Sequence, residues 1–264
     1  MSQITVDTGS CVSDGACVAV CPLGSLVLNE KGFPEEVPGS TCIFCGHCVA
    51  VCSCSALAHA GLPQEPFLPA AKELPDHALI DSFLLSRRSV REFRDEPIAR
   101  ETLEALLDVA RRAPTASNSQ NVHWIVVNGK TKVRALAAET VNWVQKSGFP
   151  AARLELWKQR WEQGHDFILR EAPAVIVACT PADYAWGKQD CAIALTFLEL
   201  SAEARGLGVC WTGILARTAD LHAPLRKALS VPEGYAVHGA LMLGKRTYSY
   251  ELVPPRKPLS VQWL

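Results

Sequence analysis

From residue 76 onward, the apolar residues follow two spacings, one typical of helices and one typical of strands. Helical spacing predicts helices within 77–89 and 100–113, and a longer helix within 190–208. Continuous apolar runs predict buried strands at 123–129 and 173–180. The pattern is therefore that of an ordinary domain built from both helices and strands.

The rest of this region can be interpreted in the same way. The span from Thr131 to Arg170 is predicted to be mainly helical. A strand then leads to a small turn at Thr212 and Gly213, followed by a short helix from Asp220 to Leu229 and a strand at 236–244. The tail after residue 249 is apolar but broken by prolines, so we expect it to lie against a neighbouring subunit.

The chain before residue 76 is organised differently. Its first 61 residues are dense in cysteine and too few for a substantial core, so bound metal would have to supply stability. Prolines 63, 66, 69 and 75 then mark an extended tether. We therefore predict a first domain at 1–62, a linker at 63–75 and a second domain at 76–264.

Charge and hydropathy narrow the location and the partners. The 264 residues carry 26 Lys and Arg against 27 Asp and Glu, so we expect no nucleic-acid partner and no anionic membrane partner. No apolar run reaches the roughly 20 residues that span a bilayer. The N-terminus lacks the features of a secretory signal. We expect a cytoplasmic protein.

Eight of the eleven cysteines lie between Cys11 and Cys54. A disulfide framework is one explanation, but the spacing is that of metal ligands. CIFCGHCVAVC, from Cys42 to Cys52, has the C-x-x-C-x-x-C-x-x-x-C spacing of an iron–sulfur ligand run. CVSDGACVAVCP, at 11–22, repeats it with Asp14 at the second ligand position. A structural zinc site would use four cysteines and would not explain this duplication.

In two-cluster ferredoxins, the fourth cysteine of each run binds the other cluster. By this crossed scheme, one cluster is held by Cys21, Cys42, Cys45 and Cys48. The other cluster is held by Cys11, Cys17 and Cys52, with Asp14 at the fourth position. The segment resembles the bacterial two-cluster ferredoxins over nearly its whole length, apart from Asp14 and from Ser53, which replaces the usual second proline.

Three outcomes remain open for the second cluster. It is a four-iron cluster with Asp14 as a labile ligand, a three-iron cluster with Asp14 free, or absent, because a carboxylate suits sulfur-rich iron less well than a thiolate. Cys54 lies close in sequence, and is either a reserve ligand or a buried structural thiol.

Polar motifs in the second domain point to a phosphate-bearing cofactor. SRRSVREF, at 86–93, packs guanidinium groups and a hydroxyl densely enough to suit a phosphate and a polyol chain. With the loop APTASNSQNVHW and the tail motif RKPL, it resembles the FMN-dependent nitroreductase superfamily, which includes the iodotyrosine deiodinases. The resemblance implies an α+β fold with a central, mainly antiparallel sheet flanked by helices, and an interlocked homodimer with FMN in the interface.

The resemblance also implies an FMN site. Arg87, Arg88, Ser89 and Arg91 would hold the phosphate and ribityl chain, and Arg256 would add a phosphate contact. Thr115 and Asn118 would approach the ribityl and ring from the partner subunit, and Thr212 and Gly213 would lie near N5. No side chain is predicted as a catalytic acid or base, because flavin N5 carries the chemistry.

These modules together predict an FMN-dependent oxidoreductase that passes single electrons through its clusters to FMN and reduces a small nitro, enone or quinone acceptor. The electron donor would be NAD(P)H or an external low-potential protein. Two other functions remain open: a non-catalytic electron-transfer or redox-sensing protein, and a reductive dehalogenase.

Overall fold

The computed structural model describes residues 3–146 and 151–264. The chain forms two compact units, Met1–Leu74 with Ser117–Ser119, and Pro75–Ala116 with Gln120–Leu264. The finer boundaries that the sequence predicts, with a separate linker at 63–75, stay a prediction. Each unit has its own sheets and its own core.

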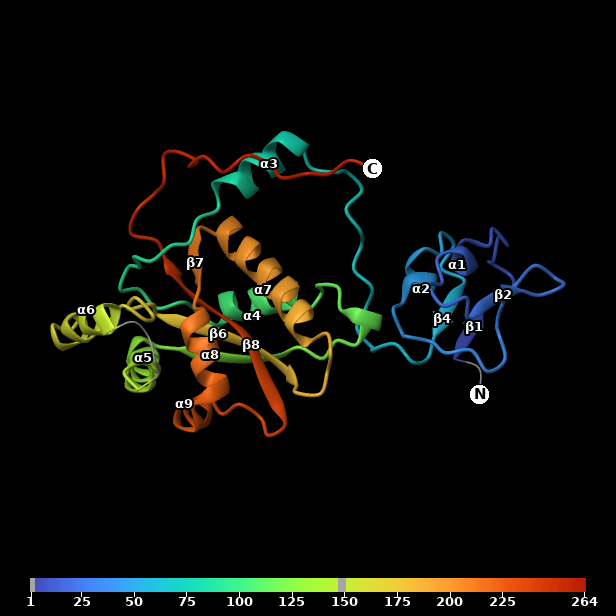
Figure 1. The fold of residues 1–264 in the computed structure, drawn as a ribbon. Helices are drawn as coiled ribbons and strands as arrows, with labels where there is room; N and C mark the ends of the chain where they lie inside the picture. Colours follow the sequence, from blue (N-terminus) through green and yellow to red (C-terminus); the bar gives the residue numbers. More distant parts are fainter. Residues whose placement is uncertain (1–2, 147–150) are drawn as a thin grey trace. The chain divides into compact units, whose positions relative to one another are not determined.

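The first unit contains two small antiparallel sheets and two helices of one turn each (Figure 1). Strand β1 (Ile4–Val6) pairs with β4 (Leu57–His59), and β2 (Leu26–Leu28) pairs with β3 (Pro34–Glu36). The helices are α1 (Ala16–Ala19) and α2 (His47–Ala50). The buried residues of its core are few: Ile4, Cys17, Leu26 and Leu57. Such short elements around so small a core need stabilisation from another source.

The second unit is built on a four-stranded antiparallel sheet with the strand order β5-β6-β8-β7. Its strands are β5 (His123–Asn128), β6 (Ala174–Pro181), β7 (Leu207–Trp211) and β8 (Tyr235–Lys245). The central strand β6 is almost fully buried, as expected for an apolar run covered on both faces. The helices of the unit supply that cover (Figure 1).

Two helical layers enclose this sheet. Ile176 of β6 packs in a core with α4 (Arg100–Ala110) and α7 (Gly187–Ala204). Val175, its neighbour in sequence, faces the opposite core, because successive side chains of a strand alternate between its faces. That core holds residues of α5 (Lys130–Val144), α8 (Gly213–Leu221) and α9 (Ala223–Ala228). The predicted α+β class is confirmed.

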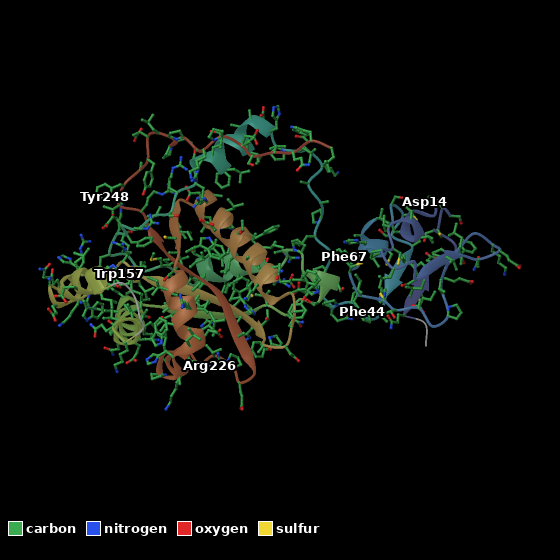
Figure 2. All side chains as sticks on the ribbon, viewed as in Figure 1. Asp14, Phe44, Phe67, Trp157, Arg226 and Tyr248 are labelled. Atoms are coloured by element: carbon green, nitrogen blue, oxygen red, sulfur yellow. The ribbon has the colours of Figure 1, made fainter. Side chains whose placement is uncertain are left out.

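The remaining elements are not part of these two layers, although Trp161 of the last one packs against the core that holds α5, α8 and α9. They are α3 (His77–Ser86), a 3-10 turn at Ala116–Asn118, and α6 (Ala151–Glu162). On α6, the ring of Trp157 stacks on Phe167 at a centroid distance of 5.0 Å (Figure 2). Within the described residues, no helix is both long and apolar enough to cross a lipid bilayer.

Most predicted elements of the second unit are confirmed, and the main difference is a helix that the sequence analysis did not predict. The helical span predicted from Thr131 to Arg170 is α5 and α6, and its residues 147–150 lie outside the described part of the chain. The short helix predicted from Asp220 to Leu229 is α9, which starts three residues later, and the prediction missed a second helix before it. Helix α8 already begins at Gly213, and α9 is a separate helix with Pro224 in its first turn, after His222 in an extended conformation.

Candidate cofactor sites

The first unit contains an internal sequence repeat. The second ligand run begins at Cys42, 31 positions after Cys11, so each residue of the first half is equivalent to the residue 31 positions later. The backbone repeats as well. Gly15 precedes α1 with φ 71°, and Gly46 precedes α2 with φ 73°. These left-handed conformations favour glycine and turn the ligand run into each short helix. The two halves are therefore equivalent in backbone, and their side chains can be compared position by position.

One cavity of this unit, of about 640 Å³, is lined by four cysteines. They are the set that the crossed scheme assigns to one cluster: Cys21, Cys42, Cys45 and Cys48. The first cysteine comes from one half of the repeat and the other three from the other half. Four soft thiolates are the donor set that an iron–sulfur cluster takes, so the residues fit a [4Fe–4S] cluster.

A second, smaller cavity, of about 20 Å³, gathers the other predicted ligands. Its lining includes Cys11, Asp14, Cys17, Cys52 and also Cys54. Asp14, labelled beside α1 in Figure 2, is exposed, and its Oδ1 accepts a hydrogen bond of 3.0 Å from the Ala16 N–H. The donor set of this cavity therefore has four thiols and one carboxylate.

Backbone N–H groups approach the fourth cysteine of each run in the same way. The Ser25 N–H donates to Cys21 Sγ and the Ala56 N–H to Cys52 Sγ, both at 3.2 Å. Burial alone would raise the pKa of both thiols, but the hydrogen bonds they accept outweigh it, so both pKa values lie below the usual range. The pKa shifts therefore favour the thiolate, which is the form that binds metal.

The third cysteine of each run is shifted in the opposite direction. Burial raises the pKa of the Cys17 thiol and of the Cys48 thiol, because it disfavours the charged form. The two halves therefore match in their pKa shifts as well as in their backbone. A bound metal ion would reverse this shift by stabilising the thiolate.

His59 adds a contact that the sequence analysis did not predict. Its Nε2 lies 3.5 Å from Cys42 Sγ, and its Nδ1 accepts a hydrogen bond of 3.1 Å from the Gly61 N–H. Because Nδ1 is the acceptor, the ring proton is on Nε2 and points to the sulfur. The equivalent residue of the other half is Leu28, which lines the second cavity.

In the second unit, Arg87 and Trp211 are joined by a carboxylate that the sequence analysis missed. Glu199 lies on α7, and only 6% of its side chain is exposed. It accepts hydrogen bonds from Arg87 at 2.9 Å and from the Trp211 Nε1–H at 3.0 Å. A lone acidic residue within the apolar run TFLELSA was the available signal. This network ties the start of the arginine motif to the end of β7.

The guanidinium of Arg88 uses only one of its three nitrogens in hydrogen bonds to the described residues. Its Nη1 donates to the carbonyl oxygens of Leu85 and Arg87, at 2.8 and 2.6 Å. Its Nε and Nη2 are buried without a hydrogen-bond partner among the residues that the structure describes. A buried guanidinium with unpartnered N–H groups is costly unless a ligand satisfies them. Such a group fits the phosphate of a bound cofactor.

Next to Arg88, the chain runs alongside β7. Ser89 forms a bridge with Val209, and the Val90 N–H donates to the Val209 carbonyl at 2.9 Å. The strand ends two residues later, and Thr212 caps α8. A Cβ added to Gly213 would meet no atom within 4 Å, so the N-terminus of α8 is open on that side. The predicted turn at Thr212 and Gly213 is this helix start.

The remaining predicted residues are placed elsewhere. Arg91 and Arg256 are exposed. Thr115 Oγ1 accepts a hydrogen bond from the Gln120 N–H at 3.1 Å. The next residue, Ala116, donates to Asp190, which is nine residues before Glu199 on α7 and thus about 13 Å away along the axis. A single chain therefore does not bring Thr115 to the arginine motif.

Asn118 belongs to the first unit, together with Ser117 and Ser119. Its side-chain amide donates to the carbonyl oxygens of Ile43 and Phe44, at 3.1 and 3.0 Å. These two residues lie between the ligand cysteines Cys42 and Cys45. The amide thus has partners in the ligand loop, and the predicted role of Asn118 at the flavin stays a prediction.

The structure combines a unit with two cysteine-lined cavities and an α+β unit in which Arg88 has buried N–H groups without a partner among the described residues. Residues 84–245 match the Nitroreductase family, and residues 3–53 match the 4Fe-4S dicluster domain. The first match spans more than half of the chain, so the chain belongs to the nitroreductase family. It is an oxidoreductase of that family with an N-terminal dicluster domain, which confirms the resemblance that the sequence motifs indicated.

Individual proteins show the same relationship. The 5,6-dimethylbenzimidazole synthase of Rhodospirillum rubrum is 30% identical over 179 residues, which are 62% of this chain and 82% of that protein. The 4-nitrobenzoate reductase of Nocardioides sp. is 26% identical over 208 residues, 65% of this chain and 82% of that one. A nitroreductase crystal structure with bound FMN from Desulfitobacterium hafniense is similar in fold. Its TM-score is 0.58 at 24% identity, over 72% of this chain and all of that one.

Proposed function

We propose that this chain is an FMN-dependent oxidoreductase that takes up single electrons through two iron–sulfur clusters and reduces a small conjugated or aromatic acceptor. Nitro, enone and quinone compounds are the acceptor classes. One observation carries the proposal: the same chain has two cysteine-lined cavities and an arginine, Arg88, whose Nε and Nη2 are buried without a hydrogen-bond partner among the described residues. When bound, FMN accepts electrons singly and releases them in pairs as a hydride.

Arg88 is the main residue proposed to hold FMN, because its free Nε and Nη2 suit a phosphate oxygen pair. Arg87 is kept in position by Glu199, and Ser89 by its bridge to β7. Arg91 and Arg256 are proposed to add cationic contacts. Thr212 and Gly213 offer the N-terminus of α8, where N–H groups without intrahelical partners favour electron-rich ligand atoms.

Two identical subunits complete the proposed flavin site. Thr115 precedes Ala116, which is bonded to Asp190 on α7, whereas the arginine motif is bonded to Glu199 farther along the same helix. Thr115 is therefore too far from the arginine motif of its own chain, so we assign Thr115 and Asn118 to the partner's site. Apolar side chains stand exposed on α3, where Leu79 is 70% exposed, and in the tail, where Trp263 is 91% exposed. Surfaces of this kind are normally covered by a partner, which supports a homodimer.

For the clusters, we propose a [4Fe–4S] cluster in the first cavity. The second cavity would hold a cluster on Cys11, Cys17 and Cys52. The sequence left it open whether this is a four-iron cluster with an Asp14 ligand or a three-iron cluster. Both alternatives use the same three thiolates and differ only in whether a fourth iron is held.

Rapid mixing of the reduced holoprotein with a panel of acceptors tests the activity. The panel contains a nitroarene, an enone, a quinone and an aryl halide, and either NAD(P)H or a low-potential ferredoxin serves as donor. Fast, saturable reoxidation by one of the first three classes is expected. Selective turnover of the halide would favour a dehalogenase. Uniformly slow reoxidation by all small molecules would overturn the enzyme in favour of an electron-transfer protein.

The proposed phosphate contact can be tested through FMN affinity. Arg88→Ala removes two unpartnered N–H donors, and a hydrogen bond to a charged group is worth about 1.5–3 kcal/mol, so FMN affinity should fall at least about tenfold. Arg100→Ala is the matched control, because Arg100 is an exposed arginine paired with Glu104 on α4. Equal FMN affinity of the Arg88 variant and the control in fluorescence titrations would exclude Arg88 from the site.

A further inference from the structure

We infer that Cys54 is the fourth thiolate ligand of the second cluster, an inference that rests on the proposal that the first unit binds two clusters. The eight cysteines of the first unit divide evenly between its two cavities. Four line the first cavity: Cys21, Cys42, Cys45 and Cys48. Four line the second: Cys11, Cys17, Cys52 and Cys54. Each cavity thus has the thiols for a complete four-iron cluster.

The internal repeat shows why Cys54 is available there. With the offset of 31 positions, Cys54 is equivalent to Leu23. Leu23 lines the first cavity, as Cys54 lines the second, so this backbone position faces a cavity in both halves. It carries a thiol only beside the cavity where Asp14 has replaced a ligand cysteine. The second cavity therefore lacks the cysteine at position 14 but has an additional cysteine at position 54.

Asp14 is the weaker candidate for two reasons. Its Oδ1 already accepts the Ala16 N–H, a bond that holds the start of α1. A carboxylate is also a hard ligand, whereas cluster iron prefers a soft thiolate when both are within reach. Asp14 is exposed, and Cys54 is half-buried in the lining of the cavity. The structural role of Asp14 is therefore to hold the turn at Gly15 and Ala16, where α1 begins.

Cys54 lies next to a ligand already. Its Sγ is 3.7 Å from the Sγ of Cys52. The two thiolates bind different irons of one cluster, so rotation of the Cys54 side chain must separate them. On binding, the Cys54 thiol gives its proton to solvent, and its sulfur forms one bond to the iron that no other cysteine holds. No group is oxidised or reduced in this step.

Iron and sulfide analysis with EPR on the anaerobically reconstituted full-length protein tests the inference. The wild type should contain about eight iron atoms per chain, as two four-iron clusters require. Cys54→Ala should contain about seven and should show the EPR signal of an oxidised three-iron cluster. Asp14→Asn, which keeps an oxygen for the Ala16 N–H, should match the wild type. Leu23→Ala, at the equivalent position of the other cavity, is the control and should also match.

The outcomes separate this inference from the proposed function. Loss of iron in Asp14→Asn with full iron in Cys54→Ala would overturn it in favour of the carboxylate. Equal iron in both variants and in the wild type would overturn it as well. A wild type with one cluster or none would contradict the two-cluster proposal itself. The EPR signal of the reduced first cluster reports in every variant whether the unit has folded.

Discussion

The two halves of the first unit share a backbone but differ in many side chains. Each half has a left-handed glycine, a one-turn helix and an N–H donated to the sulfur of the last cysteine. Among the equivalent pairs that line the cavities, three differ in ways that bear directly on a bound metal: Asp14 and Cys45, Leu23 and Cys54, and Leu28 and His59. The comparison teaches that the backbone determines the positions of the metal ligands, while single side chains determine which donor atoms line each cavity.

The largest effect on iron content is expected when the ligand position of one half receives the side chain found in the other half. Cys45→Asp gives the first cavity the carboxylate of the second, but the equivalent of Cys54 there is Leu23. With three thiolates left, the first cluster should lose one iron, and the content should fall from about eight to about seven atoms per chain. Iron analysis and the EPR signal of a three-iron cluster measure this loss.

The double variant Cys45→Asp with Leu23→Cys should restore the missing iron. It rebuilds in the first cavity the ligand set that we infer for the second. The single variant Leu23→Cys controls for an additional thiol that meets a complete set of ligands, and its iron content should not change. A full four-iron cluster in Cys45→Asp alone would show that an aspartate suffices, which would remove the need for Cys54.

A smaller effect is expected from the histidine that only one half has. The N–H of His59 donates to Cys42 Sγ, and such a bond stabilises the more negative, reduced cluster. His59→Leu should therefore lower the midpoint potential of the first cluster by about 60 mV, one factor of ten in a one-electron equilibrium. Redox titration followed by EPR measures the shift.

The mirror variant of this experiment is Leu28→His. Leu28 lines the second cavity as His59 lines the first, so the new donor should raise the potential of the second cluster. Opposite shifts in the two variants would support the hydrogen bond as the cause. An unchanged potential in His59→Leu would exclude His59 from tuning the first cluster.

In the first unit, the spacing of the cysteines predicts the cluster ligands directly, and this assignment stays a prediction. The crossed assignment needed only the two ligand runs, and each cavity gathers the set it named. The inferred role of Cys54 as a cluster ligand does not follow from the spacing of the ligand runs. It depends on a turn that places this position in the lining of the cavity. His59 was missed because its contact with Cys42 joins residues 17 positions apart, one on β4 and one in the loop before α2, and no spacing rule links them.

In the second unit, periodicity predicted the elements that pack along their whole length, such as β6 and α7. It missed α8, which begins at the predicted turn of Thr212 and Gly213, and it placed the start of α9 three residues too early. Glu199 was also missed, because one charge in an apolar helix does not reveal its partners. Those partners are Arg87, 112 positions away, and Trp211, which lies 12 positions away on the next strand.

The smallest expected effect concerns a turn in which only one half has a glycine. Gly24 has φ 61°, and the equivalent Ser55 has φ 54°. A non-glycine residue in this conformation costs about 1 kcal/mol. Gly24→Ser should therefore destabilise the first unit by about that amount, and Ser55→Gly should stabilise it similarly. A Cβ at Gly24 meets no atom within 4 Å, so a clash cannot account for the loss.

The rate of cluster bleaching at a fixed guanidinium concentration measures both effects, because the clusters are lost when the unit unfolds. A change of 1 kcal/mol corresponds to about a fivefold difference, which sets the upper limit for the change in rate. The double variant with both substitutions moves the glycine from one half to the other and should bleach at the wild-type rate. A large change in the double variant would mean that the two turns are not equivalent, and the position-by-position comparison of the halves would fail at this point.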